Sequence, residues 1–193
     1  SMVDSVLLLV DAVDGPMPQT RFVTQKAFEK ELNPILVINK IDRPSARPDW
    51  VQDQVFDLFD RLGGNDQQMD FPTIYTSALN GTSGLDLEKI EGDMSPLLDL
   101  IISKVNEPAV SLEEPFQMQI SALDSNSYVG VIGIGRISRG NVKPNDQVVV
   151  IDAEGEQKAG KILQVLGYEG LERVEVDKAE AGDIVCVTGI EKL

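Results

Sequence analysis

The stretch that decides the fold is Ile35-Leu36-Val37-Ile38-Asn39-Lys40-Ile41-Asp42. It opens with an uninterrupted apolar run, which is typical of a strand buried on both faces of a parallel sheet. A polar tetrapeptide follows at once, at residues 39–42. In open α/β sheets, ligands bind beyond the carboxyl ends of the strands. We therefore expect residues 39–42 to lie at a binding edge.

The residues around this stretch alternate between apolar runs and amphipathic segments. The apolar runs predict two further buried strands, at residues 6–10 and 72–76. The amphipathic segments predict helices that span residues 19–31 and residues 49–62. We therefore expect residues 1–110 to form an α/β domain, in which helices cover a mostly parallel sheet.

A third helix is expected to follow Ser95, which we predict to be its N-cap. Its predicted apolar face consists of Leu98, Ile101, Ile102 and Val105. Two proline-containing stretches between residues 107 and 115 then form a polar connector, so a domain boundary is expected near residue 110.

The second part of the chain, residues 111–193, reads as all strand. Turn signals separate β-rich runs at residues 116–121, 129–137, 147–151, 160–166 and 184–187. Several short strands with regular turns are typical of a small closed barrel. The expected fold class is thus α/β followed by an all-β barrel.

Composition excludes several classes of protein. The sequence has no histidine, which excludes Ser-His-Asp, Cys-His and imidazole acid–base chemistry on this chain. One cysteine allows no intrachain disulfide and no cysteine-based zinc cluster, and suggests a reduced, cytoplasmic setting. The net charge of −15 argues against generic binding to nucleic acid or to an anionic membrane. No apolar run approaches the roughly 18 residues of a membrane helix.

The residue types at positions 39–42 suit recognition of guanine. The Asp42 carboxylate can accept hydrogen bonds from the adjacent N1–H and exocyclic amino groups of guanine, a pair of donors that adenine lacks. Asn39 can contact the N7 and O6 edge, and the stem of Lys40 can lie across the flat face of the base. Ile41 is expected to contribute packing.

A second candidate segment follows the third predicted strand, at Ser77-Ala78-Leu79. The backbone N–H of Ala78 can donate to guanine O6, and the Ser77 hydroxyl can orient the Asp42 carboxylate. Alternatively, residues 39–44 are an ordinary polar loop and residues 76–81 form a helix cap.

Several longer strings carry a family resemblance. They are residues 10–23, 37–44, 46–51, 115–120 and 126–137. Together they resemble the translational GTPases related to elongation factor G, and specifically the TypA/BipA branch. The resemblance covers almost the whole chain.

The resemblance implies a ribosome-associated GTPase whose nucleotide domain is followed by a barrel like domain two of the elongation factors. It implies GTP and GDP as ligands, and ribosomal RNA and ribosomal proteins as partners in large-subunit assembly, translation and stress adaptation. Asn39, Lys40 and Asp42 match the family's guanine motif, and residues 77–79 match its last nucleotide motif. Many GTPases carry lysine where Leu79 stands, so one base-stacking stem is missing here.

The phosphate-binding motif of such enzymes, G-x-x-x-x-G-K-[ST], does not occur in the sequence. The family's Mg²⁺ loop and its catalytic histidine are expected before Asp11. We therefore expect a piece of a longer GTPase that neither hydrolyses GTP nor binds it tightly by itself. A circular permutation does not explain the pattern, because no phosphate loop follows Ser77.

Two other features leave alternatives open. The basic residues Arg136, Arg139 and Lys143 are expected either to meet RNA phosphates or to form a solvated hairpin. Acidic residues between Asp86 and Asp93 favour a solvated surface over a metal site.

An unpaired sheet edge at residues 6–10 is expected to promote self-association. The rival hypotheses are a non-catalytic module that binds RNA or ribosomal protein, and a metabolic α/β enzyme.

Overall fold

The computed structural model describes residues 2–126 and 130–190. The chain folds as two compact units, Val3–Asn106 and a second unit composed mainly of the residues from Glu107 onward. Among the described residues, no helix is both long and apolar enough to cross a membrane.

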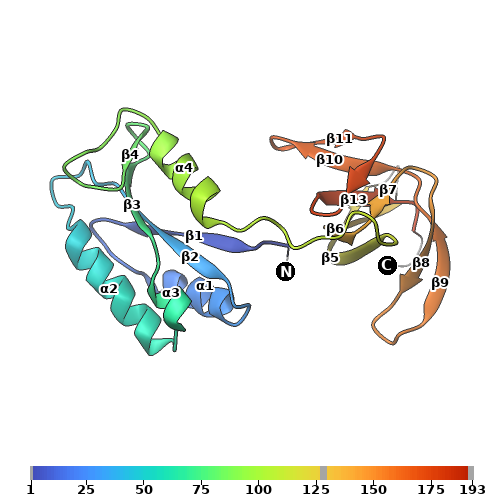
Figure 1. Ribbon diagram of the computed structural model, residues 1–193, viewed down its shortest axis with the longest axis horizontal. Coiled ribbons are helices and arrows are strands. Elements are labelled where there is room, and N and C mark those ends of the chain that lie inside the picture. Colours follow the sequence, from blue (N-terminus) through green and yellow to red (C-terminus); the bar gives the residue numbers. More distant parts are fainter. Residues whose placement is uncertain (1, 127–129, 191–193) are drawn as a thin grey trace. The chain divides into compact units, whose positions relative to one another are not determined.

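The first unit is built on a four-stranded sheet in the order β1-β2-β3-β4 (Figure 1). The strands are β1 (Ser5–Asp11), β2 (Asn33–Asn39), β3 (Thr73–Ser77) and β4 (Thr82–Gly84). The first three pair in parallel, and β4 is antiparallel to β3. The three predicted strands are therefore confirmed in position. The burial predicted for residues 6–10 is wrong for one face of β1, where Leu7 and Leu9 are exposed. The short strand β4 was not predicted, because its three residues carry no apolar pattern.

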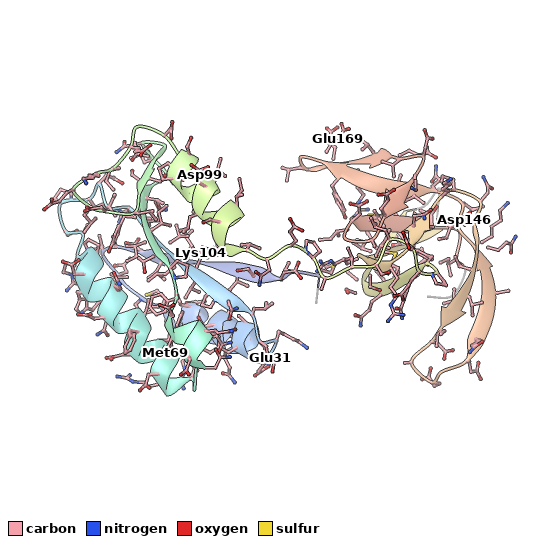
Figure 2. The ribbon with its side chains drawn as sticks, viewed as in Figure 1. Glu31, Met69, Asp99, Lys104, Asp146 and Glu169 are labelled. Atoms are coloured by element: carbon pink, nitrogen blue, oxygen red, sulfur yellow. The ribbon has the colours of Figure 1, made fainter. Side chains whose placement is uncertain are left out.

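Helices cover both faces of this sheet. Figure 1 shows α1 (Pro18–Phe28), α2 (Pro48–Arg61) and α3 (Asp66–Met69) on one side, with α4 (Ser95–Lys104) on the other. The amphipathic face predicted for α2 is confirmed, since Val51, Val55 and Phe59 are buried against β1 and β2. Met69 of α3, labelled in Figure 2, packs against the same core.

Two details of the predicted helices are wrong. Helix α1 ends at Phe28 rather than at Glu31, because Glu31 adopts a left-handed backbone conformation with φ of 56°. In α4, Ser95 is the first helical residue and Met94 is the N-cap, without a capping side-chain hydrogen bond.

The predicted apolar face of α4 is wrong in part. Leu98 and Ile102 are 57% and 80% exposed, whereas Leu100 is buried. Val105 packs against the core of the sheet as predicted, together with Leu97 and Leu100, which were not predicted; the strand residues of this core are Ile35, Val37 and Ile74. Nearly every position of α4 that could face the sheet is apolar, so periodicity could not select the buried side.

The second unit is all β. Its main sheet has the order β11-β10-β13-β6-β5, and two further ladders join β12 to β7 and β8 to β9. The strands are β5 (Gln117–Asn126), β6 (Gly130–Arg139), β7 (Asn141–Val142), β8 (Gln147–Ile151), β9 (Gln157–Lys161), β10 (Val165–Glu169), β11 (Glu172–Glu175), β12 (Ala179–Glu180) and β13 (Ile184–Thr188).

These strands share one apolar core, formed by residues such as Ile137, Val165 and Val187. Within the described residues, however, the ladders are three separate sheets and do not form one continuous closed sheet. The single strand predicted at 160–166 is two strands, β9 and β10, because the backbone between them bonds to Asp146 and Thr188. Val129, where the predicted second strand began, lies outside the described residues, and so do Ser127 and Tyr128.

Candidate functional site

The predicted site residues gather at the carboxyl ends of the parallel strands. Asn39 is the last residue of β2 and Ser77 the last of β3. In the sheet register, Asn39 lies opposite Thr76 on one side and opposite Asp11, the last residue of β1, on the other. Three strand ends therefore meet at one edge of the sheet.

Hydrogen bonds set the orientation of the Asn39 amide. Its Oδ1 accepts from Thr76 Oγ1 at 3.2 Å and from the backbone N–H of Ala78 at 3.0 Å. Because both donors face Oδ1, the NH₂ group is directed away from them and remains a donor for another acceptor. Such a donor suits the N7 and O6 edge of a purine.

A hydroxyl–carboxylate bond joins the two predicted segments. Ser77 Oγ donates to Asp42 Oδ1 at 2.5 Å, the contact expected from the sequence. Ser77 Oγ also accepts from the backbone N–H of Asn80 at 3.3 Å. No described protein group bonds to the other oxygen of Asp42, which can accept hydrogen bonds from a ligand.

The remaining predicted residues have different surroundings. Ile41 is half-buried and packs against the core of the α/β unit, as expected. Leu79 is 87% exposed, so its side chain contributes little to the fold. The Ala78 N–H, expected to donate to guanine O6, donates to Asn39 here, so a ligand oxygen must share or replace that bond.

Lys40 folds back toward the first strand. Its backbone is in the left-handed region, with φ of 68°. Its Nζ donates to Asp11 Oδ2 at 2.6 Å, and the Lys40 side chain is 44% exposed against 14% for Asp11. The ammonium group of Lys40 is therefore held by a carboxylate.

Asp11 was missed by the sequence analysis. Its Oδ1 accepts from the backbone N–H groups of Val13 at 2.8 Å and of Asp14 at 3.4 Å. Burial raises the pKa of the Asp11 carboxyl, but the bonds from Lys40, Val13 and Asp14 outweigh it, so the pKa lies below its ordinary value. A signal was present: Asp11 ends a predicted parallel strand next to the strand that Asn39 ends.

The turn after β1 is also tied to the start of α2. Arg47 donates from its backbone N–H to the Ala12 carbonyl at 2.8 Å and from its guanidinium to the Val13 carbonyl at 3.0 Å. The same guanidinium lies 4.0 Å from the Trp50 ring centre. Gly15 lies close to Trp50, since a Cβ at this position would come within 2.9 Å of the ring.

The other candidate clusters have local roles. Asp86 and Asp93 accept backbone hydrogen bonds from Glu88 and Ser95, respectively. Residues 2–126 and 130–190 contain no group of three or more acidic, cysteine or histidine side chains placed to hold a metal ion. In the β unit, Arg139 pairs with Glu114 at 2.9 Å, so part of the predicted basic cluster is neutralised.

Comparison with known proteins accounts for this arrangement. The family described as "Elongation factor Tu GTP binding domain" matches residues 1–107, which is more than half of the chain. The chain belongs to this GTP-binding domain family. "Elongation factor Tu domain 2" matches residues 130–193, so a β domain follows the GTP-binding domain.

Relatives in several bacteria place the chain within this family. The protein named "Large ribosomal subunit assembly factor BipA" in Escherichia coli (strain K12) is 65% identical over 193 residues, which are 100% of this chain and 32% of that protein. The protein of the same name in Haemophilus influenzae is 64% identical over 193 residues, again 100% of this chain and 31% of that protein. The predicted resemblance to the TypA/BipA branch is confirmed. The chain spans about a third of the length of these relatives.

A solved structure supports the fold. The translation elongation factor SelB from Methanococcus maripaludis, in its apo form, matches with a TM-score of 0.72 at 20% identity. The match covers 100% of this chain and 37% of that one. The expected fold class, a GTP-binding α/β domain followed by a β-rich domain two, is confirmed.

Proposed function

We propose that the carboxyl ends of β2 and β3 bind the guanine base of GTP or GDP. In this proposal Asp42 accepts from the N1–H and amino groups of the base, and Asn39 donates to its N7 and O6 edge. The Lys40 stem covers one face of the base, and Ile41 packs the loop onto the domain. Ser77 orients Asp42, Ala78 donates to O6, and Leu79 lies exposed beside the base.

One observation carries the proposal: two hydrogen bonds join the two loops. Ser77 holds one oxygen of Asp42, and Asn39 holds the backbone of Ala78. These bonds leave a carboxylate oxygen and an amide NH₂ group to serve the donor and acceptor edges of guanine. Adenine has an acceptor at N1 and a donor at position 6, the reverse of guanine, and it has no amino group at position 2, so its binding would leave polar groups of the site unpaired.

For the whole protein we propose GTP hydrolysis coupled to the ribosome. The support is the family membership together with relatives named large ribosomal subunit assembly factors. The role includes large-subunit assembly, translation and stress adaptation in the cytoplasm. The Mg²⁺ of the whole protein is proposed to be held through a phosphate-binding motif that does not occur in this sequence. By itself, this chain is proposed to be inactive, because its sequence has no phosphate-binding motif.

The two segments divide this role. Residues 1–110 are proposed to be the base-recognising part of the GTPase domain, and residues 111–193 the barrel that contacts ribosomal RNA and proteins. The exposed residue Lys143 supports the second assignment as a phosphate contact, whereas Arg139 would first have to leave Glu114. The alternative function is a non-catalytic module that binds RNA or ribosomal protein. In that case the barrel alone would sediment with ribosomes, and nucleotide would not alter this.

Self-association is the remaining part of the proposal. Strand β1 is an unpaired edge of its sheet within the described residues. Leu7 and Leu9 on this strand are 46% and 62% exposed. Unpaired edges with exposed apolar side chains favour pairing with another strand. Sedimentation velocity at increasing concentration tests this, and a chain that stays monomeric throughout contradicts it.

The guanine assignment is tested by calorimetry with GDP, ADP and xanthosine diphosphate. Two proteins are compared: this chain, and the Escherichia coli K12 relative in which this chain replaces the matching 193 residues. We expect the second to bind GDP at least about 100-fold more tightly than ADP, and the chain alone to bind both weakly. Asp42→Asn should weaken GDP and strengthen xanthosine diphosphate, whose C2 carbonyl accepts from an amide.

Asp53→Asn is the matched control. Asp53 is an exposed acidic residue on α2, and its replacement removes the same charge without touching the proposed site. A hybrid protein that binds ADP as tightly as GDP, or an Asp42→Asn variant with unchanged nucleotide preference, contradicts the assignment.

A further inference from the structure

Asp11 divides its two carboxylate oxygens between two tasks. Oδ1 accepts from the backbone of the turn that follows β1, at Val13 and Asp14. Among the described residues, the Lys40 ammonium is the one donor to Oδ2, at 2.6 Å. The first task shapes a turn. The second reaches across to the neighbouring strand end.

The ion pair determines where the Lys40 side chain lies. Lys40 has four rotatable side-chain bonds, and a lysine without a partner would sample many rotamers. Its left-handed backbone, with φ of 68°, follows directly after Asn39, which lies opposite Asp11 in the register. With Nζ tied to Asp11, the aliphatic stem is held across the ends of β1 and β2, beside the outward-facing Asn39 amide.

We propose that Asp11 is a positioning residue for base binding: by holding Lys40 Nζ, it fixes the Lys40 stem as one wall of the base site. The inference rests on the proposed guanine site. In this proposal Asp11 does not touch the ligand; it acts by positioning Lys40.

The Lys40 stem would contact the flat face of a purine and not the edge that carries its hydrogen-bonding groups. Hypoxanthine has the same fused rings, O6, N7 and N1–H as guanine but lacks the exocyclic amino group. If the Lys40 stem is no longer held in place, the affinities for GDP and for inosine diphosphate should therefore fall by the same factor. Loss of an edge contact such as Asp42 should change the ratio between them.

The negative charge of Asp11, considered alone, predicts a gain of nucleotide affinity when Asp11 is replaced, and not a loss. Removing a carboxylate near an anionic nucleotide should by itself strengthen binding. Asparagine at position 11 keeps an oxygen that can accept from Val13 and Asp14, so the turn is retained. A loss of affinity in Asp11→Asn would thus report the freed lysine.

The experiment is a double-mutant cycle with Asp11→Asn and Lys40→Met. It is measured with GDP and inosine diphosphate in the Escherichia coli K12 relative carrying this chain, and stability is followed by urea unfolding. Asp11→Asn is expected to weaken both nucleotides about three- to fivefold, as befits a half-exposed ion pair. In the Lys40→Met background, Asp11→Asn should no longer weaken nucleotide binding, because methionine gives Asp11 no ammonium group to hold, and loss of the carboxylate by itself only strengthens binding. Asp53→Asn again controls for the lost charge.

Three results overturn the inference while leaving the guanine site intact. They are unchanged GDP affinity in Asp11→Asn, additive effects of the two substitutions, and a changed ratio of GDP to inosine diphosphate. A hybrid protein without any preference for GDP over ADP instead overturns the proposed function, and the inference with it. The two failures are distinguished by the unsubstituted hybrid protein.

Discussion

Asn39 accepts a hydrogen bond on its side-chain oxygen from the backbone N–H of Ala78, at 3.0 Å. The two residues are 39 positions apart in the chain, yet this bond joins the loop after β2 to the loop after β3. Thr76 Oγ1 donates to the same oxygen, and a flip of the amide would turn its NH₂ group toward the Ala78 N–H and lose that bond. A side chain assigned to base recognition therefore also holds the site together.

Replacing Asn39 with alanine should destabilise the α/β unit. The substitution leaves the Thr76 hydroxyl, on a buried residue, without this acceptor and frees the Ala78 N–H. We expect a loss of about 1–2 kcal/mol, measured by urea unfolding followed through Trp50 fluorescence. Hydrogen exchange at the Ala78 amide should accelerate. Asn33→Ala, at the exposed start of the same strand, is the control and should change neither quantity.

The ion pair between Lys40 and Asp11 should make stability depend on pH. The folded pKa of Asp11 lies below its ordinary value of 3.8. Its stabilising contribution is therefore complete above that value and is lost as the pH falls through the folded pKa. Lys40→Met should raise the pKa of Asp11 and cost about 0.5–1 kcal/mol at neutral pH, allowing for the exposure of the pair.

Urea unfolding between about pH 7 and pH 2.5, with carboxyl ¹³C shifts for Asp11, measures both effects. The difference in unfolding free energy between the unsubstituted protein and Lys40→Met should become smaller at the acidic end of this range. A difference that stays constant across the range would mean that Lys40 stabilises the fold by some means other than Asp11.

Truncation of Leu100 and truncation of Ile102, both on α4, should differ strongly in their effect on stability. Leu100 is 7% exposed and packs against the sheet, so Leu100→Ala should cost about 2–4 kcal/mol. Ile102 is 80% exposed, so Ile102→Ala should change the unfolding free energy by less than about 0.5 kcal/mol. Urea unfolding monitored by Trp50 fluorescence checks both, because the chain has a single tryptophan and it lies in this unit. Equal losses would contradict the observed orientation of α4.

Gly135 should be intolerant of any side chain. A Cβ at this position would lie 2.0 Å from the Gln119 carbonyl oxygen of the paired strand β5, which cannot withdraw without breaking the ladder. Gly135→Ala is therefore expected to destabilise the β unit by more than about 2 kcal/mol.

Gly167→Ala is the matched control, because its Cβ would meet only a methyl group of Val176, at 3.2 Å. Amide spectra of the β unit during thermal unfolding report both variants. If the β unit unfolds at the same temperature in Gly135→Ala and in Gly167→Ala, strand β5 can shift to make room for the added methyl group.

Local pattern was enough for much of the α/β unit. The apolar run at residues 35–38 is buried because it has no polar residue to place on either face. In β1, by contrast, Leu8 and Val10 are buried, whereas Leu7 and Leu9 are exposed. Helix α2 presented one apolar stripe and one polar side, so its orientation was predictable. In α4 the apolar residues surround the helix, and the shape of the opposing sheet selected Leu97 and Leu100 over Leu98 and Ile102.

The sequence by itself determined that polar residues follow the parallel strands, and therefore that Asn39, Asp42 and Ser77 meet at one edge. The Ser77–Asp42 bond was expected from the sequence, but the tertiary structure alone decided the other pairings there. The Asn39 amide orientation and the return of Lys40 to Asp11 depend on rotamers and on a left-handed backbone at Lys40. Such choices arise from contacts between residues distant in the chain, and no local periodicity encodes them.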